Sequence, residues 1–521
     1  MIRRYDAVAI GSGINSLAAA ALLAKGGWSV CVLERNEWLG GAIRTAEITE
    51  PGFVHEVFAS WHPLFMGSAA YAELKDDLEE RGLEYLNTDL PTATLFPDGA
   101  SAFLTTSHEA NVDALGPGWA RTVEEFMPNA DLAFGVLSTE LWSRDGLRLG
   151  AKALRRLGRR GLVEFAGNVL TSCRDWTAET FEDERARGVF APWVLHTGLG
   201  PDAASSGFMA QVIGVAIELG GMPVPRGGGA KLVEALRGIV EEEGGACETG
   251  RHVDRVVVEL GRATGVRTAD GEVIEAGRAV LANVTPQQLY GDLLDGSGPA
   301  DVARRFRFGR GEMQIHFALS EPPRWQGDER LGRTAIVHLT PGLDGVSRAV
   351  NEAERGLLPA EATVVVGQPM AVDPSRAPDG SWILWIQLQE VPSLPRGDAA
   401  GELDTKSGWT EALREAYADR IQARIAQHAP NLESAILRRV VYSPADIEAA
   451  DANMVGGDIY AGSCALDQNL LWRPRPGLPG HRTHVDGLWH IGASTHPGPG
   501  LGAGSGTLVA KELLKRRLLR R

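Results

Sequence analysis

The pattern of apolar and polar positions at the start of the chain predicts an α/β unit. Residues 5–10, YDAVAI, form a short apolar run that is typical of a buried strand. A glycine turn follows, and Leu17–Lys25 is rich in alanine and leucine, which favours a helix that ends at Gly26 and Gly27. WSVCVLE then supplies a second strand, which closes at Glu34.

Similar patterns return later in the chain, separated by two stretches of a different kind. Residues 75–225 are mostly helical, and 291–455 are harder to interpret, although ATVVVG and SWILWIQLQ resemble sheet strands. Residues 226–290 combine a glycine turn, a helix and short strands with a hairpin at Asp270-Gly271. The end of the chain has a strand, GLWHIG, a glycine-rich turn and a helix from about Thr507. We predict an α/β nucleotide-binding domain from residues 1–75, 226–290 and 456–521, and an inserted α+β domain from 76–225 and 291–455.

The first turn carries most of a dinucleotide-binding fingerprint. The G-x-G-x-x-G pattern has Gly11 and Gly13, but Ser16 stands at the third position. The first two glycines allow the tight turn and the approach of a pyrophosphate, and serine is small enough for close helix packing. Glu34 ends the second strand, where a carboxylate accepts hydrogen bonds from a ribose and disfavours a 2′-phosphate.

Two further glycine-rich segments favour FAD over NAD. ERNEWLGGAIRT, directly after the strand, contributes Arg35, the pair Gly40-Gly41 and Arg44, whose guanidinium can pair with a pyrophosphate. GLWHIGASTHPGPGLGAGSG runs from a strand through a glycine-rich turn into a helix. Backbone amides at such a helix start can face the pyrimidine edge of a flavin.

Composition restricts the class of protein and of partner. The chain has 521 residues and a formal net charge of −15, which argues against a nucleic-acid partner. Its four cysteines are widely spaced and predict neither a disulfide framework nor a metal site. Without a secretory signal or an apolar stretch long enough to cross a bilayer, the sequence predicts a cytoplasmic protein.

Several segments occur in the order seen in phytoene desaturase-like flavoproteins. These are the fingerprint with Glu34, and then LGGAIRT, VPRGGGAKLVEAL, VLANVTP, VDPSRAPDGSWILWI, DQNLLWRPRPG and GLWHIGASTHPGPGLGAGSG. The chain most resembles the branch of pyridine nucleotide-disulfide oxidoreductase domain-containing protein 2, which is related to carotenoid desaturases and isomerases. The resemblance implies a Rossmann-like FAD-binding domain of the GDP-dissociation-inhibitor and amine oxidase superfamily, with an inserted substrate domain.

The resemblance also assigns cofactor contacts residue by residue. It implies that Gly11, Gly13 and Ser16 meet the pyrophosphate and that Glu34 meets the adenosine ribose. Further expected contacts are Arg35, Gly40, Gly41, Arg44, Val253, Gly492, Pro497, Leu501 and Gly502. The sequence departs from the family at Ser16 and in GLGAGSGTLVAK, where the family more often has an asparagine.

The family's chemistry transfers a hydride to or from the flavin, and desaturation also needs a proton to leave the neighbouring carbon. His496 is the candidate catalytic residue by position, although it could equally only shape its turn. His62 beside Trp61 is better explained by packing. Asp467 and Gln468 belong to a family motif near the cofactor and could be structural.

Residues 144–165 are basic and amphipathic in a chain that is otherwise acidic. Seven Lys or Arg residues alternate with leucines there. Such a helix could lie on an anionic bilayer and receive a lipophilic substrate, helped by the tail KRRLLRR. The alternative is a solvated helix whose leucines pack on the domain core, and the sequence favours that alternative.

Three functions remain open at this level. The first is FAD-dependent desaturation of a lipophilic, carotenoid-like or polyene substrate. The second keeps the flavin for isomerisation, saturation or cyclisation of a polyene, or for oxidation of an amine, with Trp61 and Trp472 as possible cage residues. The third is an escort protein that has lost the cofactor. Because no second nucleotide fingerprint is visible, we expect oxygen, a quinone or a protein as electron acceptor; the oligomeric state is left open.

Overall fold

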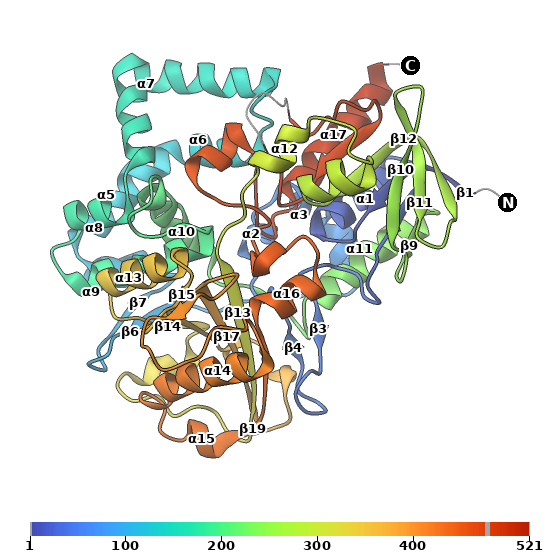
Figure 1. Ribbon diagram of the computed structural model, residues 1–521. Coiled ribbons are helices and arrows are strands. Elements are labelled where there is room, and N and C mark those ends of the chain that lie inside the picture. Colours follow the sequence, from blue (N-terminus) through green and yellow to red (C-terminus); the bar gives the residue numbers. More distant parts are fainter. Residues whose placement is uncertain (1–2, 475–479, 520–521) are drawn as a thin grey trace.

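The computed structural model describes residues 3–474 and 480–519 and contains two large sheets with helices packed around them (Figure 1). Within these residues the first sheet has seven strands in the order β10-β11-β12-β1-β2-β9, and β20 also pairs with β12. Its strands are β1 (Arg3–Ile10), β2 (Val30–Leu33), β9 (Ala246–Glu248), β10 (Val253–Glu259), β11 (Arg262–Thr268), β12 (Val273–Asn283) and β20 (Leu488–Ile491).

The centre of this first sheet is parallel. β1 pairs in parallel with β2 and with β12, and β12 pairs in parallel with β20. Three segments that are far apart in the sequence therefore place their carboxyl ends at one edge. In open α/β sheets that edge is where a ligand binds.

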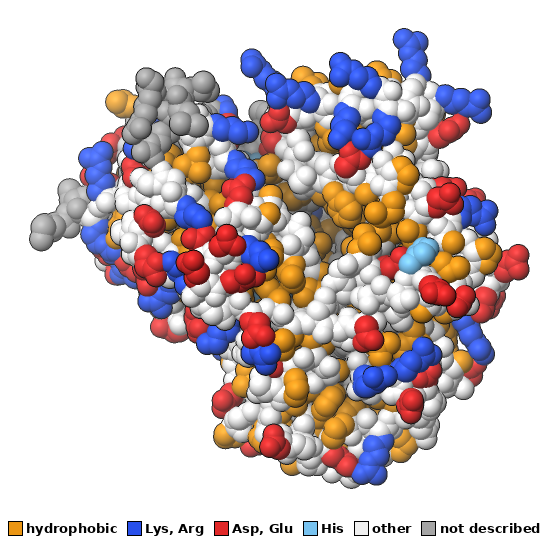
Figure 2. All heavy atoms as spheres, turned by 180° about the vertical axis from the view of Figure 1, so that it is seen from behind, with side chains coloured by type: hydrophobic (Ala, Val, Ile, Leu, Met, Phe, Trp, Pro, Cys, Tyr) orange, Lys and Arg blue, Asp and Glu red, His pale blue; other side chains and the backbone are white. Residues whose placement is uncertain are grey.

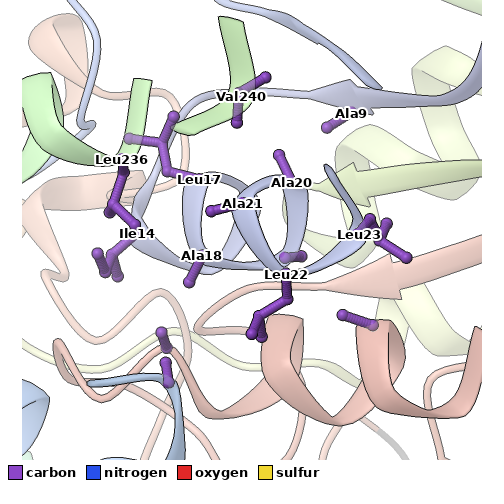
Figure 3. Packing of buried hydrophobic residues seen from close by; sticks show 14 of the residues in the cluster. Ala9, Ile14, Leu17, Ala18, Ala20, Ala21, Leu22, Leu23, Leu236 and Val240 are labelled. Carbon is purple, nitrogen blue, oxygen red and sulfur yellow. The ribbon is translucent and has the colours of Figure 1, made fainter. Parts of the chain in front are cut away.

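Helix α1 (Ile14–Lys25) is buried on every side from Ile14 to Ala24. Its sequence, INSLAAAALLAK, consists largely of small or straight-chain residues that favour a helix and allow neighbours to approach from all directions. It packs against α11 (Ala230–Glu242) and α17 (Gly504–Leu519), as Figure 3 shows with Leu236 and Val240 from α11. The start of α1 is thereby fixed relative to the sheet.

The second sheet also has seven strands among the described residues, in the order β19-β13-β17-β16-β14-β6-β7. They are β6 (Thr92–Leu95), β7 (Ser101–Leu104), β13 (Gly311–Leu319), β14 (Ile336–Leu339), β16 (Val364–Gly367), β17 (Trp382–Val391) and β19 (Ile436–Tyr442). One face packs against α14 (Glu411–Ala426) through apolar side chains of β13 and β17. The other face carries polar residues.

Most remaining helices come from the residues between β7 and β8 (Val224–Pro225). They are α4 (His108–Leu115), α5 (Pro117–Phe126), α6 (Ala130–Ser138), α7 (Arg144–Leu170), α8 (Cys173–Thr180), α9 (Glu184–Phe190) and α10 (Ser206–Gly220). Outside this region lie α2 (Pro63–Met66), α3 (Ala69–Glu80), α12 (Ala300–Arg305), α13 (Leu343–Glu354), α15 (Leu432–Ala435) and α16 (Pro444–Ala450). The α/β class with an α+β insertion is confirmed, whereas the domain boundaries proposed above stay a prediction.

Helix α7 lies at the surface of the molecule. None of its described side chains is fully buried, but Leu149, Leu157 and Leu162 are half-buried, so the packing of its leucines on the domain core stays a prediction. Gly158 adopts a left-handed φ of 68° and divides α7 into two straight parts, which project from the molecule in Figure 1. The tail KRRLLRR lies largely outside the side chains that the structure describes.

Candidate functional site

A cavity of about 1180 Å³ lies between the two sheets and is lined by residues of both. Its wall includes the β1–α1 turn at one end and the polar face of the second sheet at the other. From behind, Figure 2 shows orange side chains around a hollow in the middle of the molecule. Among the described residues, no group of three His, Cys, Asp or Glu is placed to hold a metal ion.

The turn between β1 and α1 begins at Gly11, and hydrogen bonds to Glu34 hold it in place. Gly11 has φ of 82°, a conformation that a side chain would strain. The Glu34 carboxylate accepts hydrogen bonds from the backbone N–H of Ser12 at 2.9 Å, its hydroxyl at 2.7 Å, and the backbone N–H of Asn36 at 2.9 Å. The turn and the end of β2 therefore form one rigid wall.

The Gly40-Gly41 pair lies directly against this turn. A Cβ on Gly41 would come within 3.2 Å of the Gly13 Cα, and one on Gly13 would lie 3.0 Å from Asn283 Nδ2. No side chain caps the N-terminus of α1. The result is a cradle of backbone at a helix start, which is the arrangement that binds phosphate.

Asn283, at the end of β12, is a structural residue that the sequence did not single out. Its side-chain N–H donates to the Ser16 hydroxyl at 3.0 Å, and its carbonyl accepts from Asn453 at 3.1 Å. Ser16 is buried and absent from the cavity wall, so its hydroxyl braces β12 instead of facing the cavity. This contact explains how the fingerprint accommodates serine in place of its third glycine.

The glycine-rich turn after β20 is fixed from two sides. Ser505 accepts a hydrogen bond from the backbone N–H of Gly492 at 2.7 Å, and the Gly506 N–H donates to Asn15 at 3.2 Å. The buried Arg473 guanidinium donates to the carbonyls of Ala493 at 2.8 Å and Tyr460 at 2.9 Å. The turn thus presents the residues Ala493, Ser494, Pro499, Gly500 and Leu501 to the cavity.

The structure brings together only some of the residues predicted to contact the cofactor. Those on the cavity wall are Gly11, Gly13, Glu34, Arg35, Gly40, Gly41, Val253 and Leu501. Those that are absent from the wall are Ser16, Arg44, Gly492, Pro497 and Gly502. The Arg44 guanidinium lies 4.0 Å from the ring centre of Trp38, a cation–π contact that holds it outside the cavity.

His496 is not placed as the predicted catalytic residue. Its ring is buried, is absent from the cavity wall, and makes a 2.9 Å hydrogen bond through Nε2 to the Thr139 carbonyl. Burial, with the nearby His481, lowers its pKa to about 4. The histidine therefore braces the turn in this structure, and its role as the base stays a prediction.

The other residues considered for catalysis also have structural partners. His62 contacts the Tyr85 hydroxyl at 3.0 Å, and burial lowers its pKa to about 3. Asp467 pairs with Arg307 at 2.8 Å, and Gln468 accepts from the backbone N–H of that arginine. Trp472 lies off the cavity wall, whereas Trp61 lines it.

A buried ion-pair network fixes the loop that precedes α11. Arg376 has no solvent exposure and donates to Glu56 at 2.9 Å, to Asp373 at 2.7 Å and to the Pro225 carbonyl at 2.9 Å. Glu56 in turn accepts from the backbone N–H of Gly229 at 2.7 Å. This network links VPRGGG and VDPSR, two segments that are distant in the sequence.

The model of the family described as flavin containing amine oxidoreductase matches residues 17–330, more than half of the chain. The chain belongs to this family. Its sequence is 27% identical to pyridine nucleotide-disulfide oxidoreductase domain-containing protein 2 of Mus musculus, over 97% of this chain and 92% of that protein. It is 26% identical to the phytoene desaturase (neurosporene-forming) of Cereibacter sphaeroides, over 97% of this chain and 94% of that protein.

Solved structures support the fold of this flavin-dependent oxidoreductase. The cyclohexylamine oxidase of Brevibacterium oxydans superposes with a TM-score of 0.61 at 15% identity, covering 99% of this chain and all of that one. The predicted family, fold class and cofactor, FAD, are confirmed. The described residues fit FAD, because the backbone cradle and Glu34 match its pyrophosphate and ribose.

Two of the three tryptophans and the polar residues at the substrate end of the cavity were not predicted. Trp193 and Trp385 join Trp61 on the wall, so three indole rings face the cavity. Beside them lie Glu312 and Gln389, from β13 and β17. The sequence of β13, GEMQIHFAL, contains the pattern that could have indicated these residues. In it polar Glu312 alternates with apolar residues that pack on α14.

Replacing Glu34 with alanine should weaken FAD binding by about tenfold to a hundredfold, because the ribose loses a charged acceptor and the turn loses its brace. Retention of FAD during dialysis against dilute cofactor measures the change. Glu37→Ala, three residues further along, is the control because Glu37 lies off the cavity wall. Equal retention by the Glu34 variant and the wild type would contradict this assignment.

Proposed function

We propose that this FAD-dependent oxidoreductase desaturates a lipophilic polyene. The observation that carries the proposal is a cavity that continues from the cofactor cradle to an apolar opening. Leu64, Leu219 and Phe134 line it and are 59%, 63% and 40% exposed, so apolar side chains border its mouth. An exposed apolar rim favours entry of an apolar molecule. The similarity to the bacterial phytoene desaturase supports the same class.

The reaction breaks two C–H bonds on adjacent carbons and forms a C=C bond. FAD held by the cradle and Glu34 would supply the hydride acceptor for one carbon, while the second carbon would release its proton to solvent. The chain's residues position the substrate between the tryptophans and the cradle, and the buried wall excludes water. Oxygen, a quinone or a partner protein would then take up the two electrons, so that the flavin is reoxidised.

Anaerobic bleaching of the flavin absorbance tests this proposal. Flavin should be identified first by the visible spectrum of the purified protein and by FAD released on heating. We expect lipophilic polyenes to bleach the band and simple amines to leave it unchanged. Bleaching by amines alone would favour amine oxidation, the second candidate, for which the three tryptophans on the wall could form an aromatic cage.

We further propose that α7 docks on an anionic membrane surface and delivers the substrate. Its Leu147 and Val163 are 75% and 72% exposed, and Figure 2 shows basic side chains gathered along the upper right edge, where α7 lies in this view. Lys152 and Arg156 pair with Asp131 of α6, the helix that also carries Phe134 to the cavity mouth. No helix among the described residues is long and apolar enough to cross a membrane. We propose a cytoplasmic location at a bilayer surface, which the exposed apolar and basic side chains of α7 support.

The double variant Leu147→Gln, Val163→Gln should bind vesicles of phosphatidylcholine and phosphatidylserine about tenfold more weakly than the wild type. The reason is that the two exposed apolar side chains, which would be buried in the bilayer interface, are replaced by polar ones. Co-sedimentation measures binding, and added salt should weaken it further by screening the basic residues. Leu260→Gln, at a fully exposed leucine in the β10–β11 turn, is the control. Unchanged binding by the double variant would remove α7 from the docking surface.

A further inference from the structure

The end of the cavity away from the glycine cradle contains polar groups that a hydrocarbon would leave unsatisfied. Glu312, Gln387 and Gln389 all line the cavity, on the face of the second sheet opposite α14. Glu312 and Gln389 are 2% and 4% exposed, so both are almost wholly inside the protein. Their position beside Trp193 and Trp385 is otherwise suited to an apolar ligand.

The hydrogen bonds of these side chains are only half complete. Glu312 Oε1 accepts from the side-chain N–H groups of Gln314 and Gln387, each at 2.7 Å. Its Oε2 has no hydrogen-bond partner among the described residues. Gln389 donates to the Tyr460 hydroxyl at 3.2 Å, and its Oε1 also has no partner in that part of the chain.

The two unpartnered atoms differ in character. Because Oε1 of Glu312 already accepts two N–H groups, the proton of the neutral acid resides on Oε2, which then donates. Burial supports the neutral form, since it raises the pKa of Glu312 to about 8. Gln389 Oε1 can only accept. The pair therefore offers one donor and one acceptor to a group in the cavity.

We propose that the substrate carries a hydroxyl group, which accepts a hydrogen bond from Glu312 and donates one to Gln389. The inference rests on the proposed function for the rest of the substrate, a lipophilic chain, and adds the chemistry of its end. A hydroxyl both donates and accepts, whereas a hydrocarbon leaves both buried atoms unsatisfied. Glu312 and Gln389 are thus specificity residues for an oxygenated substrate.

Equilibrium dialysis of the FAD-loaded full chain with radiolabelled geranylgeraniol tests this inference without turnover. The competitors are its methyl ether, which cannot donate, and the hydrocarbon of the same skeleton without the oxygen. We expect the ether to bind about tenfold more weakly than the alcohol and the hydrocarbon about a hundredfold more weakly. Equal binding of all three would overturn the proposal.

Three variants assign the effect to the residues. Glu312→Gln keeps an N–H donor at the site and should retain the preference for the alcohol. Gln389→Met removes the acceptor with little change of shape and should reduce that preference about tenfold. Glu390→Gln is the matched control, because Glu390 is a similarly buried acid in β17, the strand of Gln389, but does not line the cavity.

The outcomes separate this inference from the proposed function. Preference for the alcohol with no bleaching by any polyene would overturn the desaturase proposal alone. Bleaching by a hydrocarbon polyene, with no preference for the alcohol, would overturn the hydroxyl site alone. Tight binding of geranylgeranylamine that Glu312→Gln abolishes would replace the hydroxyl with an ammonium group facing an ionised Glu312.

Discussion

Replacing Arg376 with methionine should lower the free energy of unfolding by about 3–5 kcal/mol. The variant leaves the carboxylates of Glu56 and Asp373 buried without their cation, and the Pro225 carbonyl without its donor. Because Glu56 also holds the backbone of Gly229, we expect the loop before α11 to loosen and FAD retention to fall. Denaturant unfolding followed by fluorescence measures the stability.

The control for Arg376 is an exposed pair beside the same loop. Arg226 bonds to Glu84 at 2.7 Å, but both side chains are more than half exposed. Arg226→Met should therefore leave the unfolding midpoint close to that of the wild type. Similar losses in the two arginine variants would show that burial of the network is not what makes it important.

Replacing Glu312 with glutamine should raise the free energy of unfolding at pH 7 by about 3 kcal/mol. In the unfolded chain Glu312 loses its proton near its ordinary pKa of 4.5, whereas burial holds the proton in the folded protein up to a pKa of about 8. The unfolded state therefore binds fewer protons between these values, and wild-type stability falls as the pH rises through that range. The glutamine does not titrate and avoids this loss.

Thermal unfolding of the wild type and the Glu312→Gln variant between pH 4.5 and pH 8 checks this prediction. The difference between the two proteins should be small at the acid end and should grow steadily with pH. Glu243→Gln, at an exposed glutamate after α11, is the control and should show no such trend. A stability difference that is constant over the range would show that Glu312 ionises normally in the folded protein.

Local patterns in the sequence were sufficient to predict the elements that form the cofactor half of the site. The β1–α1 turn, the strand that ends at Glu34 and the last strand with its glycine turn are set by neighbouring residues. The last helix begins at Gly504, three residues before the position predicted from the sequence. The Ala- and Leu-rich composition of α1 similarly made its helix predictable, although not its complete burial.

Contacts between distant residues could not be predicted in this way. His496 is held by the carbonyl of Thr139, which is 357 positions away, and this contact turns its ring from the cavity. Arg376 and Glu56 are separated by 320 positions. The alternation in β13 was visible, but which face meets the cavity depends on α14 packing against the other face. The directions of these side chains thus depend on tertiary contacts, which the sequence pattern does not contain.

The position of β20 and α17 has a consequence for the synthesis of the protein. A Cβ on Gly506 would lie 1.9 Å from the Asn15 carbonyl oxygen, so α17 is seated directly on α1, which was translated almost five hundred residues earlier. While the intervening chain leaves the ribosome, α1 keeps an uncovered apolar side and the cradle lacks its last wall. We therefore expect a nascent chain to complete its FAD site only after residues 488–506 have emerged.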